Sequence, residues 1–242
     1  MSHKRNYLSM VYQGTKCKTA RTFGKEVIRP YMKEREIYIF TDILLKNKPK
    51  KVLEYGCGYS TIYYPQFLTE GAEWIAIEHS KMWADNVSKR INKKNTVIYC
   101  VPPDIEPFKD EGYEQDFITY IDKGKEFAPY DLILVDGMAR EVCIDRAYNM
   151  LTENGLLVVH DANREIYRES MKKFPHVVIL EDFRRGSGGI AFLSKSHPIS
   201  YYVDLNKHIK LWKKGTFWGN FFKFKYLMGK PSKPFRLIES LK

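Results

Sequence analysis

Short runs of apolar residues alternate along the chain with longer stretches in which apolar residues recur every three or four positions. The short runs predict strands at residues 51–54, 74–78, 96–101, 131–136, 155–160, 176–180 and 189–193. The longer stretches predict helices at residues 34–46, 60–68, 80–91, 140–151 and 164–174. Strands that alternate with helices are typical of an α/β domain with a largely parallel sheet.

The first strand leads into a glycine-rich turn with the sequence VLEYGCGYST. The strand ends in an acid, Glu54, and Gly56 and Gly58 bracket a single residue. Glycine allows the positive φ of a tight turn and lets the backbone approach a ligand at the start of a helix. Ser60 and Thr61 are suited to cap that helix. The turn is therefore a candidate cofactor loop, although a simple strand-to-helix connection would use the same residues.

Later strands also end in polar residues. Glu78 closes a strand about twenty residues after the glycines, a spacing that suits a carboxylate gripping a ribose diol. Asp136 follows the run YDLILV, and the run LLVVH ends in His160, with Asp161 next. Ligands bind beyond the carboxyl ends of strands in open α/β sheets, so we expect these side chains to share one edge.

Together, the motif E-x-G-x-G, the acid Glu78, YDLILVDG and LLVVHD resemble the class I S-adenosylmethionine-dependent methyltransferases, over about residues 50–195. The resemblance implies a Rossmann-like fold, with a seven-stranded, mostly parallel sheet whose last strand is antiparallel, flanked by helices. It also implies S-adenosylmethionine as the cofactor, bound by Glu54, Gly56, Gly58, Tyr59, Ser60, Thr61 and Glu78. A dinucleotide-binding protein is the nearest alternative, but Thr61 stands where G-x-G-x-x-G has its third glycine.

The length of 242 residues suits one α/β domain with extensions. The formal net charge of +11 is concentrated at the two ends: residues 1–34 hold 8 Lys/Arg against 2 acids, and residues 203–242 hold 10 against 2. We therefore divide the chain into a basic N-terminal extension (1–34), a catalytic domain (35–200) and a basic aromatic C-terminal extension (201–242).

The sequence shows no export or membrane-spanning signal. No apolar run approaches the roughly 18 residues that a membrane span needs, and the N-terminus has no apolar signal segment. We expect a cytoplasmic protein, with any membrane contact peripheral and at the inner face. The four cysteines have no metal-like spacing, so reduced thiols are expected.

Each extension allows two interpretations. The N-terminal one, interrupted by Gly14, Gly24 and Pro30, is expected to form loops or short helices that either close a substrate site or remain a solvated basic arm. In the C-terminal one, aromatic residues from Trp212 to Tyr226 alternate with lysines, which suits a membrane surface or an anionic polymer. The alternative is a helix docked on the core or on a second subunit of a homodimer. Nucleic acid is the less favoured anionic partner.

Methyl transfer to an alcohol requires an aligned acceptor and removal of its proton. Asp136, His160 and Asp161 are predicted to meet at neighbouring strand ends, where His160 is a candidate base with a midpoint near 6.5, roughly the usual value, unless neighbours shift it. The alternative is that Asp136 caps a helix and His160 is a packed strand-end residue. Metal-dependent catechol-type methyltransferases resemble this pattern, but their Asp-Asn pair is split here as Asp161-Ala162-Asn163. That departure leaves a bound Mg²⁺ open.

A finer resemblance concerns the acceptor. The combination of VDG-x-x-R with LLVVHD looks most like carbohydrate O-methyltransferases, including the glucuronoxylan 4-O-methyltransferases. It implies a hydroxyl of an anionic sugar as acceptor, such as glucuronic acid in a polysaccharide, with Arg140, Arg164 and Arg185 facing its carboxylate. Two other functions stay open: a divalent-metal-dependent small-molecule O-methyltransferase, and a nucleic-acid or membrane-binding protein that keeps the fold without catalysis.

Overall fold

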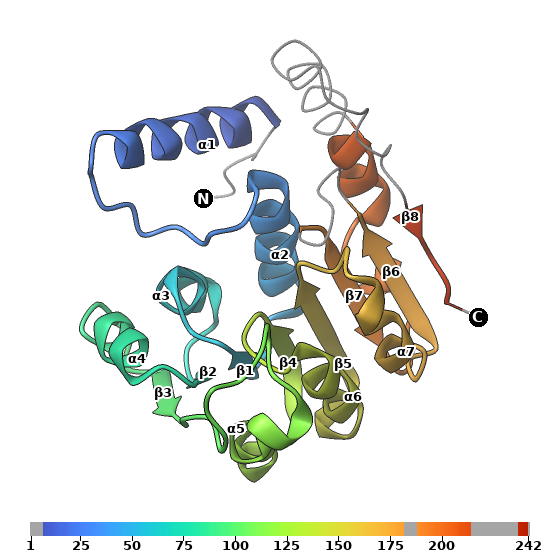
Figure 1. The fold of residues 1–242 in the computed structure, drawn as a ribbon. Helices are drawn as coiled ribbons and strands as arrows, with labels where there is room; N and C mark the ends of the chain where they lie inside the picture. Colours follow the sequence, from blue (N-terminus) through green and yellow to red (C-terminus); the bar gives the residue numbers. More distant parts are fainter. Residues whose placement is uncertain (1–6, 182–187, 214–236, 242) are drawn as a thin grey trace, which may run out of the picture.

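A computed structural model describes residues 7–181, 188–213 and 237–241. Within these residues, an eight-stranded sheet with the order β3-β2-β1-β4-β5-β7-β6-β8 forms the centre of the molecule (Figure 1). The strands are β1 (Lys51–Tyr55), β2 (Glu73–Glu78), β3 (Thr96–Cys100), β4 (Tyr130–Val135), β5 (Leu151–His160), β6 (His176–Leu180), β7 (Ile190–Ser194) and β8 (Leu237–Ile238). All seven predicted strands are present, and the Rossmann-like α/β fold is confirmed.

The directions of the strands also follow the prediction, with one addition. The strands β1 to β5 pair in parallel. The apolar runs of β1, β2, β4 and β5 are buried on both faces of the sheet, whereas β3, at the edge, is only partly buried. Strand β7 runs antiparallel to both β5 and β6. The sequence pattern did not indicate β8, which pairs Leu237 with Leu180 and Ile238 with Ile179. A strand of two residues has no apolar period by which it could be found.

The helices that follow the N-terminal extension are α2 (Glu34–Asn47), α3 (Tyr59–Tyr63), α4 (Lys81–Ser88), α5 (Ile118–Lys123), α6 (Arg140–Met150), α7 (Arg168–Met171) and α8 (Ile199–Tyr202), and residues 205–213 are also helical. The five predicted helices are present as α2, α3, α4, α6 and α7, although α3, α4 and α7 are shorter than predicted, and further helices occur outside the predicted ranges. Short 3-10 turns occupy η1 (Tyr64–Phe67), η2 (Glu114–Asp116), η3 (Gly124–Phe127) and η4 (Glu165–Tyr167). Met82 of α4 is 80% exposed although it is apolar. The buried face of α4 is carried by Ala84 and Val87, which are three residues apart, and Met82 lies off that face.

The N-terminal extension contains a 16-residue helix, α1 (Tyr7–Thr22), so the expectation of loops or short helices is wrong there. Gly14 does not interrupt this helix but faces Glu34 of α2, where a Cβ on Gly14 would lie 2.5 Å from Glu34 Cγ. The glycine therefore allows the two helices to approach each other. Helix α1 packs against α2 at the outside of the molecule (Figure 1).

Two apolar layers cover the sheet, one on each face. One layer includes α5, α6 and α7, with Tyr120, Cys143 and Met171 buried against the strands. The other includes α2, η1 and α8, with Phe40 and Tyr202 buried. Fully burying a large apolar side chain stabilises a fold by about 1.5–3 kcal/mol. Both layers therefore stabilise the fold, one on each face of the sheet. All four cysteines are free thiols, as expected.

The first part of the C-terminal extension docks on the core. Trp212 is fully buried, its indole N–H donates to the Glu181 carbonyl oxygen at 2.8 Å, and the Arg35 guanidinium lies 4.4 Å from its ring centre. The docked-helix alternative therefore describes residues 205–213. Residues 214–236, which carry the rest of the predicted membrane or polymer contact, lie outside the described part of the chain. In the described part, no helix combines the length and the apolar character that crossing a membrane requires.

Candidate active site

Strands β1, β2, β4 and β5 end at one edge of the sheet, and the predicted site residues lie there. Backbone hydrogen bonds tie the loops at this edge together. The Asp136 N–H donates to the Tyr55 carbonyl oxygen at 3.0 Å, and the Gly56 N–H donates to the Ile77 carbonyl oxygen at 2.8 Å. The ends of neighbouring strands are therefore fixed relative to one another by the protein itself.

The two glycines of the candidate cofactor loop have different roles. Gly56 has a φ of +89°, and a Cβ there would lie 2.8 Å from Gly137 Cα, closer than real Cβ atoms come to backbone. Only glycine lets the loops after β1 and β4 cross at this distance. Gly58 has an extended backbone, and a Cβ there would meet no atom closer than 3.9 Å. A side chain at Gly58 would therefore make only ordinary van der Waals contacts, with Ser60 and Trp83, so the backbone of Gly58 is not crowded.

Glu54 lies beneath the loop and holds its shape. Its buried carboxylate accepts hydrogen bonds from Ser60 Oγ at 2.5 Å, Thr61 Oγ1 at 2.7 Å and Trp74 Nε1 at 2.8 Å. Burial raises the pKa of Glu54 to about 8, against these hydrogen bonds, which lower it. The observed contacts of Glu54, Ser60 and Thr61 are internal, and direct contact of these residues with a cofactor stays a prediction.

Glu78 is a second buried carboxylate, at the end of β2. Its Oε2 accepts the Cys57 N–H at 2.9 Å, while Oε1 accepts the Ser80 N–H at 2.8 Å and lies 2.8 Å from His79 Nδ1. Burial opposes ionisation, but the three partners lower the pKa of Glu78 below its ordinary value. An ionised carboxylate has about four lone-pair sites, so Glu78 can still accept hydrogen bonds from ribose hydroxyls.

Tyr59 connects the loop to the N-terminal extension. Its hydroxyl donates to Glu26 Oε1 at 3.0 Å, and its ring centre lies 5.4 Å from that of Tyr31. Arg90 Nε also donates to Glu26, at 2.8 Å. The segment that follows α1 therefore lies beside the candidate cofactor loop, where a segment that closes the site would have to lie.

Asp136, His160 and Asp161 meet at the ends of β4 and β5. His160 Nδ1 lies 2.9 Å from Asp136 Oδ1, and His160 Nε2 lies 4.0 Å from Asp161 Oδ1. The His160 side chain is 7% exposed, against 25% for Asp136 and 18% for Asp161, so the two carboxylates are the more accessible members. Asp161 and the nearby Ala139 both have positive φ, a conformation that costs a non-glycine residue about 1–2 kcal/mol.

Glu36, in the first turn of α2, completes this cluster, and the sequence analysis missed it. Glu36 has no exposed surface, and its Oε2 lies 3.5 Å from His160 Nε2. The same oxygen accepts the Lys33 backbone N–H at 2.6 Å. Acids are common in the first turn of helices, so the sequence position alone does not distinguish Glu36 from Glu34.

The carboxylates around His160 set its protonation state. Burial opposes a charge on His160, but Asp136 and Glu36 raise its pKa well above the ordinary value. Burial also opposes the charge on Asp136, whereas His160 and Arg140 lower the pKa of that carboxyl. The neighbouring carboxylates therefore favour the imidazolium form of His160.

Arg140, which was predicted to bind substrate, is engaged by the protein. Its guanidinium donates to the carbonyl oxygens of Gly137 at 2.9 Å, His160 at 3.1 Å and Asp136 at 3.3 Å. It also lies near three carboxylates, 3.3 Å from Asp136 and 3.6 Å from both Asp161 and Glu111. Arg140 therefore helps to hold Asp136 and Asp161 in place, and its role in substrate binding stays a prediction.

The other predicted substrate arginines are placed in different ways. Arg164 pairs with Glu111, which also accepts the Tyr167 hydroxyl at 2.5 Å and lies 3.6 Å from Arg140 Nε. Glu111 lies in the long loop between β3 and η2, where it is one of several acids and no sequence signal distinguishes it from the others. Arg185 lies outside the described residues.

The same cluster can be tested as a metal site. The ligand atoms of Asp136, His160 and Asp161 all lie within 4.8 Å of one another, which is close enough for three ligands of one ion. The charges do not fit, because Arg140 already stands between the carboxylates and both His160 nitrogens face carboxylates. The imidazolium form, which these carboxylates favour, has no lone pair for a metal. These residues therefore do not fit a resident divalent cation.

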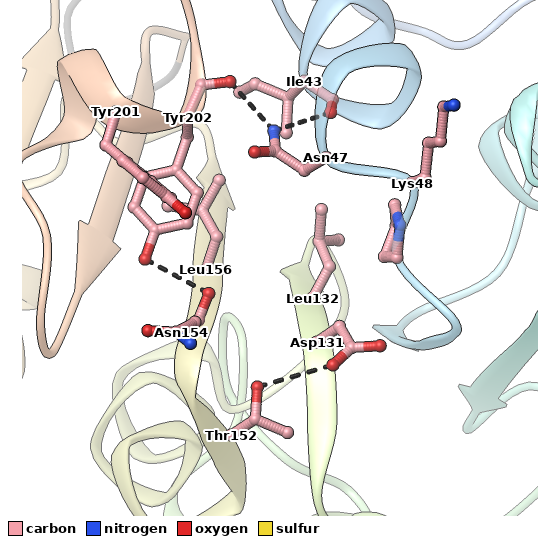
Figure 2. A pocket seen from close by; sticks show the side chains of 11 residues that line it. Ile43, Asn47, Lys48, Asp131, Leu132, Thr152, Asn154, Leu156, Tyr201 and Tyr202 are labelled. Carbon is pink, nitrogen blue, oxygen red and sulfur yellow. Dashed lines mark hydrogen bonds between the residues drawn. The ribbon is translucent and has the colours of Figure 1, made fainter.

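A separate cavity of about 310 Å³ lies at the opposite, amino end of β4 and β5 (Figure 2). Its polar groups bond to one another. Asn47 donates to the carbonyl oxygens of Ile43 and Tyr202, and the Tyr202 hydroxyl donates to the Asn154 carbonyl oxygen at 3.2 Å. The cavity is distinct from the strand-end cluster and contains none of the predicted site residues.

Solved structures establish which class of fold this is, although no family model and no curated protein sequence matches the chain. The O-methyltransferase from Bacillus cereus in complex with SAH is 16% identical, with 81% of this chain and 93% of that chain covered and a TM-score of 0.51. A candidate O-methyltransferase from Klebsiella pneumoniae is 14% identical over 81% and 93% of the two chains, with a TM-score of 0.52. A spermidine synthase in complex with the transition-state analogue AdoDATO is 15% identical over 79% and 74%, with a TM-score of 0.50. The chain therefore has the Rossmann-like fold that these proteins share, and the likeness at this identity concerns the fold alone.

Proposed function

We propose that this chain is an S-adenosylmethionine-dependent methyltransferase that methylates a hydroxyl oxygen. The proposal is carried by one observation: the candidate cofactor residues and the candidate proton acceptors lie at the same edge of the sheet. The glycine loop and Glu78 follow β1 and β2, while Asp136 and Asp161 follow β4 and β5, and β1 pairs directly with β4. A cofactor and an acceptor bound at these strand ends would be neighbours, as an in-line displacement requires.

The loop and Glu78 fit the proposed cofactor. The backbone of Gly58 is not crowded by side chains, which suits a ligand at the loop, and ionised Glu78 can accept hydrogen bonds from ribose hydroxyls. When bound, S-adenosylmethionine supplies an electrophilic methyl group. Glu54 contributes indirectly, because its hydrogen bonds to Ser60 and Thr61 fix the loop before a ligand arrives.

On the acceptor side, the chain must orient a hydroxyl and accept its proton as the oxygen forms a bond to carbon. His160 already carries a proton, so the acceptors that this geometry offers are the carboxylates of Asp136 and Asp161. Arg140 lies 3.3 Å from Asp136 and 3.6 Å from Asp161, and its charge lowers the pKa of Asp136. Their partial exposure lets the proton pass on to solvent.

We further propose an anionic sugar, such as glucuronic acid, as the class of acceptor. Its support is the excess of positive charge in the extensions, which hold 8 Lys/Arg in residues 1–34 and 10 in residues 203–242. Arg140 and Arg164 already face Glu111, so the uronate carboxylate is assigned to cations of the extensions rather than to these two arginines.

A turnover screen that follows S-adenosylhomocysteine release across uronates, neutral sugars, catechols and RNA tests this function. Release that requires a carboxylate on the sugar supports the whole proposal, and release with catechols alone overturns the sugar assignment. Salt-dependent binding to RNA or anionic vesicles with no release from any acceptor overturns the enzyme and favours a binding protein.

Calorimetry on Glu78→Ala tests the cofactor site separately. Hydrogen bonds to a charged group contribute about 1.5–3 kcal/mol, so S-adenosylmethionine should bind at least roughly 10-fold more weakly. Glu73→Ala is the matched control, because Glu73 lies exposed at the other end of β2 and should leave affinity unchanged. Wild-type affinity in Glu78→Ala would remove Glu78 from the site.

A further inference from the structure

The first turn of α2 is held from two sides. Arg29, in the N-terminal extension, donates from Nε to Glu34 Oε1 at 2.8 Å. Arg35 lies over the ring of Trp212, in the C-terminal extension, and donates to the Trp212 carbonyl oxygen at 3.5 Å. Both extensions therefore contact the same helical turn, through Glu34 and Arg35. The next residue of this turn is Glu36.

Glu36 is the buried carboxylate of this turn, and it faces the candidate active site. Its Oε2 lies 3.5 Å from His160 Nε2, while Asp136 Oδ1 lies 2.9 Å from His160 Nδ1 on the other side of the ring. An isolated ionised carboxylate is costly to bury, by several kcal/mol even after relaxation, and a neighbouring cation offsets that cost. The imidazolium of His160 is such a cation.

We propose that Glu36 is a positioning residue of the candidate active site, which holds the His160 ring from the side opposite Asp136 and keeps it protonated. His160 then orients Asp136 and keeps it ionised, and is not itself the acceptor of the substrate proton. The catalytic part of this inference rests on the proposed function, whereas the ion pair between Glu36 and His160 does not.

The charged groups that face His160 are consistent with this role. Asp136 and Glu36 each approach one ring nitrogen, and Asp161 lies 4.0 Å from Nε2. Arg140 donates to the His160 backbone carbonyl oxygen and not to its ring. The ring therefore meets three carboxylates, and Asp136 and Glu36 raise its pKa despite burial.

The direct test follows the His160 ring by NMR as the pH is raised, with His160→Gln used to identify its signals. In the wild type, we expect the charged form to persist above the ordinary histidine midpoint of about 6.5. Glu36→Gln should move the midpoint to lower pH. Glu34→Gln removes the same charge from the same helical turn and should leave the midpoint in place.

Two results would overturn the ion pair. One is a wild-type His160 that titrates near the ordinary value, which needs no variant and therefore holds even if Glu36→Gln fails to fold. The other is an equal midpoint in the wild type and in folded Glu36→Gln.

The pH dependence of methyl transfer tests the catalytic part. If His160 positions Asp136, the rate falls as His160 loses its proton, and this falling limb moves to lower pH in Glu36→Gln. A rate that rises through the same transition would make His160 the base and overturn the positioning role. A lack of turnover with every acceptor would overturn the proposed function alone, because the NMR titration measures the ion pair independently.

Discussion

The carboxyl edge of the sheet carries two clusters that are built in opposite ways. The cofactor-loop cluster (Glu54, Gly56, Gly58 and Glu78) depends on backbone: Gly56 allows two loops to cross, and Glu78 accepts backbone N–H groups from the loop and from the start of α4. The acceptor cluster (Glu36, Asp136, Arg140, His160 and Asp161) consists of three acidic and two basic side chains that pair with one another. The first fixes a shape, and the second fixes a set of protonation states.

This difference determines how each cluster responds to change. In the cofactor-loop cluster, a substitution acts where it is made, through a steric overlap or a lost hydrogen bond. In the acceptor cluster, the removal of one charge alters the pKa of every neighbour, because the groups are close and mostly buried. Substitutions at the two clusters should therefore differ in their pH dependence as well as in their size.

The largest effect is expected for Gly56→Ala. The positive φ of Gly56 adds roughly 1–3 kcal/mol of backbone strain for alanine, and overlap with Gly137 adds a comparable amount. We expect the free energy of unfolding, measured by urea denaturation, to fall by the sum of these, with loss of S-adenosylmethionine binding.

Gly58→Ala is the matched control for that prediction. Its Cβ would meet nothing closer than 3.9 Å, so the variant should fold with nearly wild-type stability. If the cofactor binds against the backbone of Gly58, the affinity for S-adenosylmethionine should still fall in this variant. Equal stability losses at Gly56 and Gly58 would contradict the assignment of a backbone crossing to Gly56 alone.

Asp136→Asn should have the next largest effect. It removes one proposed proton acceptor together with the stronger partner of His160, so kcat should fall by roughly 10²-fold or more while S-adenosylmethionine still binds. Asp161→Asn removes a carboxylate that lies 4.0 Å from His160, and should leave the His160 titration closer to that of the wild type. Near-normal turnover in both variants would exclude both carboxylates from the reaction.

The fold and the cofactor-loop cluster could be predicted because their signals are local. Apolar runs that end in polar residues place Glu78, Asp136 and His160 at one edge. Gly56 and Gly58 indicate the turn after β1. The role of Arg140 and the contact of Glu36 could not be predicted, because each depends on charges that elements far apart in the sequence bring together. The long helix α1 was missed for a related reason: Gly14 is explained by its contact with α2 and not by its own neighbours in sequence.

Glu54→Gln should change how the free energy of unfolding depends on pH. Because the folded carboxyl binds its proton up to a pKa of about 8, against 4.5 ordinarily, its contribution is complete below about pH 4.5 and is lost as the pH rises towards 8. In that window the slope for one proton approaches about 1.4 kcal/mol per pH unit. The difference in unfolding free energy between wild type and Glu54→Gln should therefore vary with pH across this window, and a constant difference would show that Glu54 is ionised in the folded protein.

The smallest expected effect is that of chelation. In the acceptor cluster, Arg140 and His160 already supply positive charge to Asp136, Asp161 and Glu36, so the cluster has no need of a divalent cation. Turnover should be unchanged after EDTA treatment, and added Mg²⁺ should not raise it. Arg140→Gln provides the contrast, because it leaves the carboxylates without their guanidinium and should increase Mg²⁺ binding, measured by calorimetry, relative to the wild type. Loss of wild-type activity in EDTA with recovery in Mg²⁺ or Mn²⁺ would instead make Asp136 and Asp161 metal ligands, and the acceptor cluster would then depend on an ion that its side chains alone do not replace.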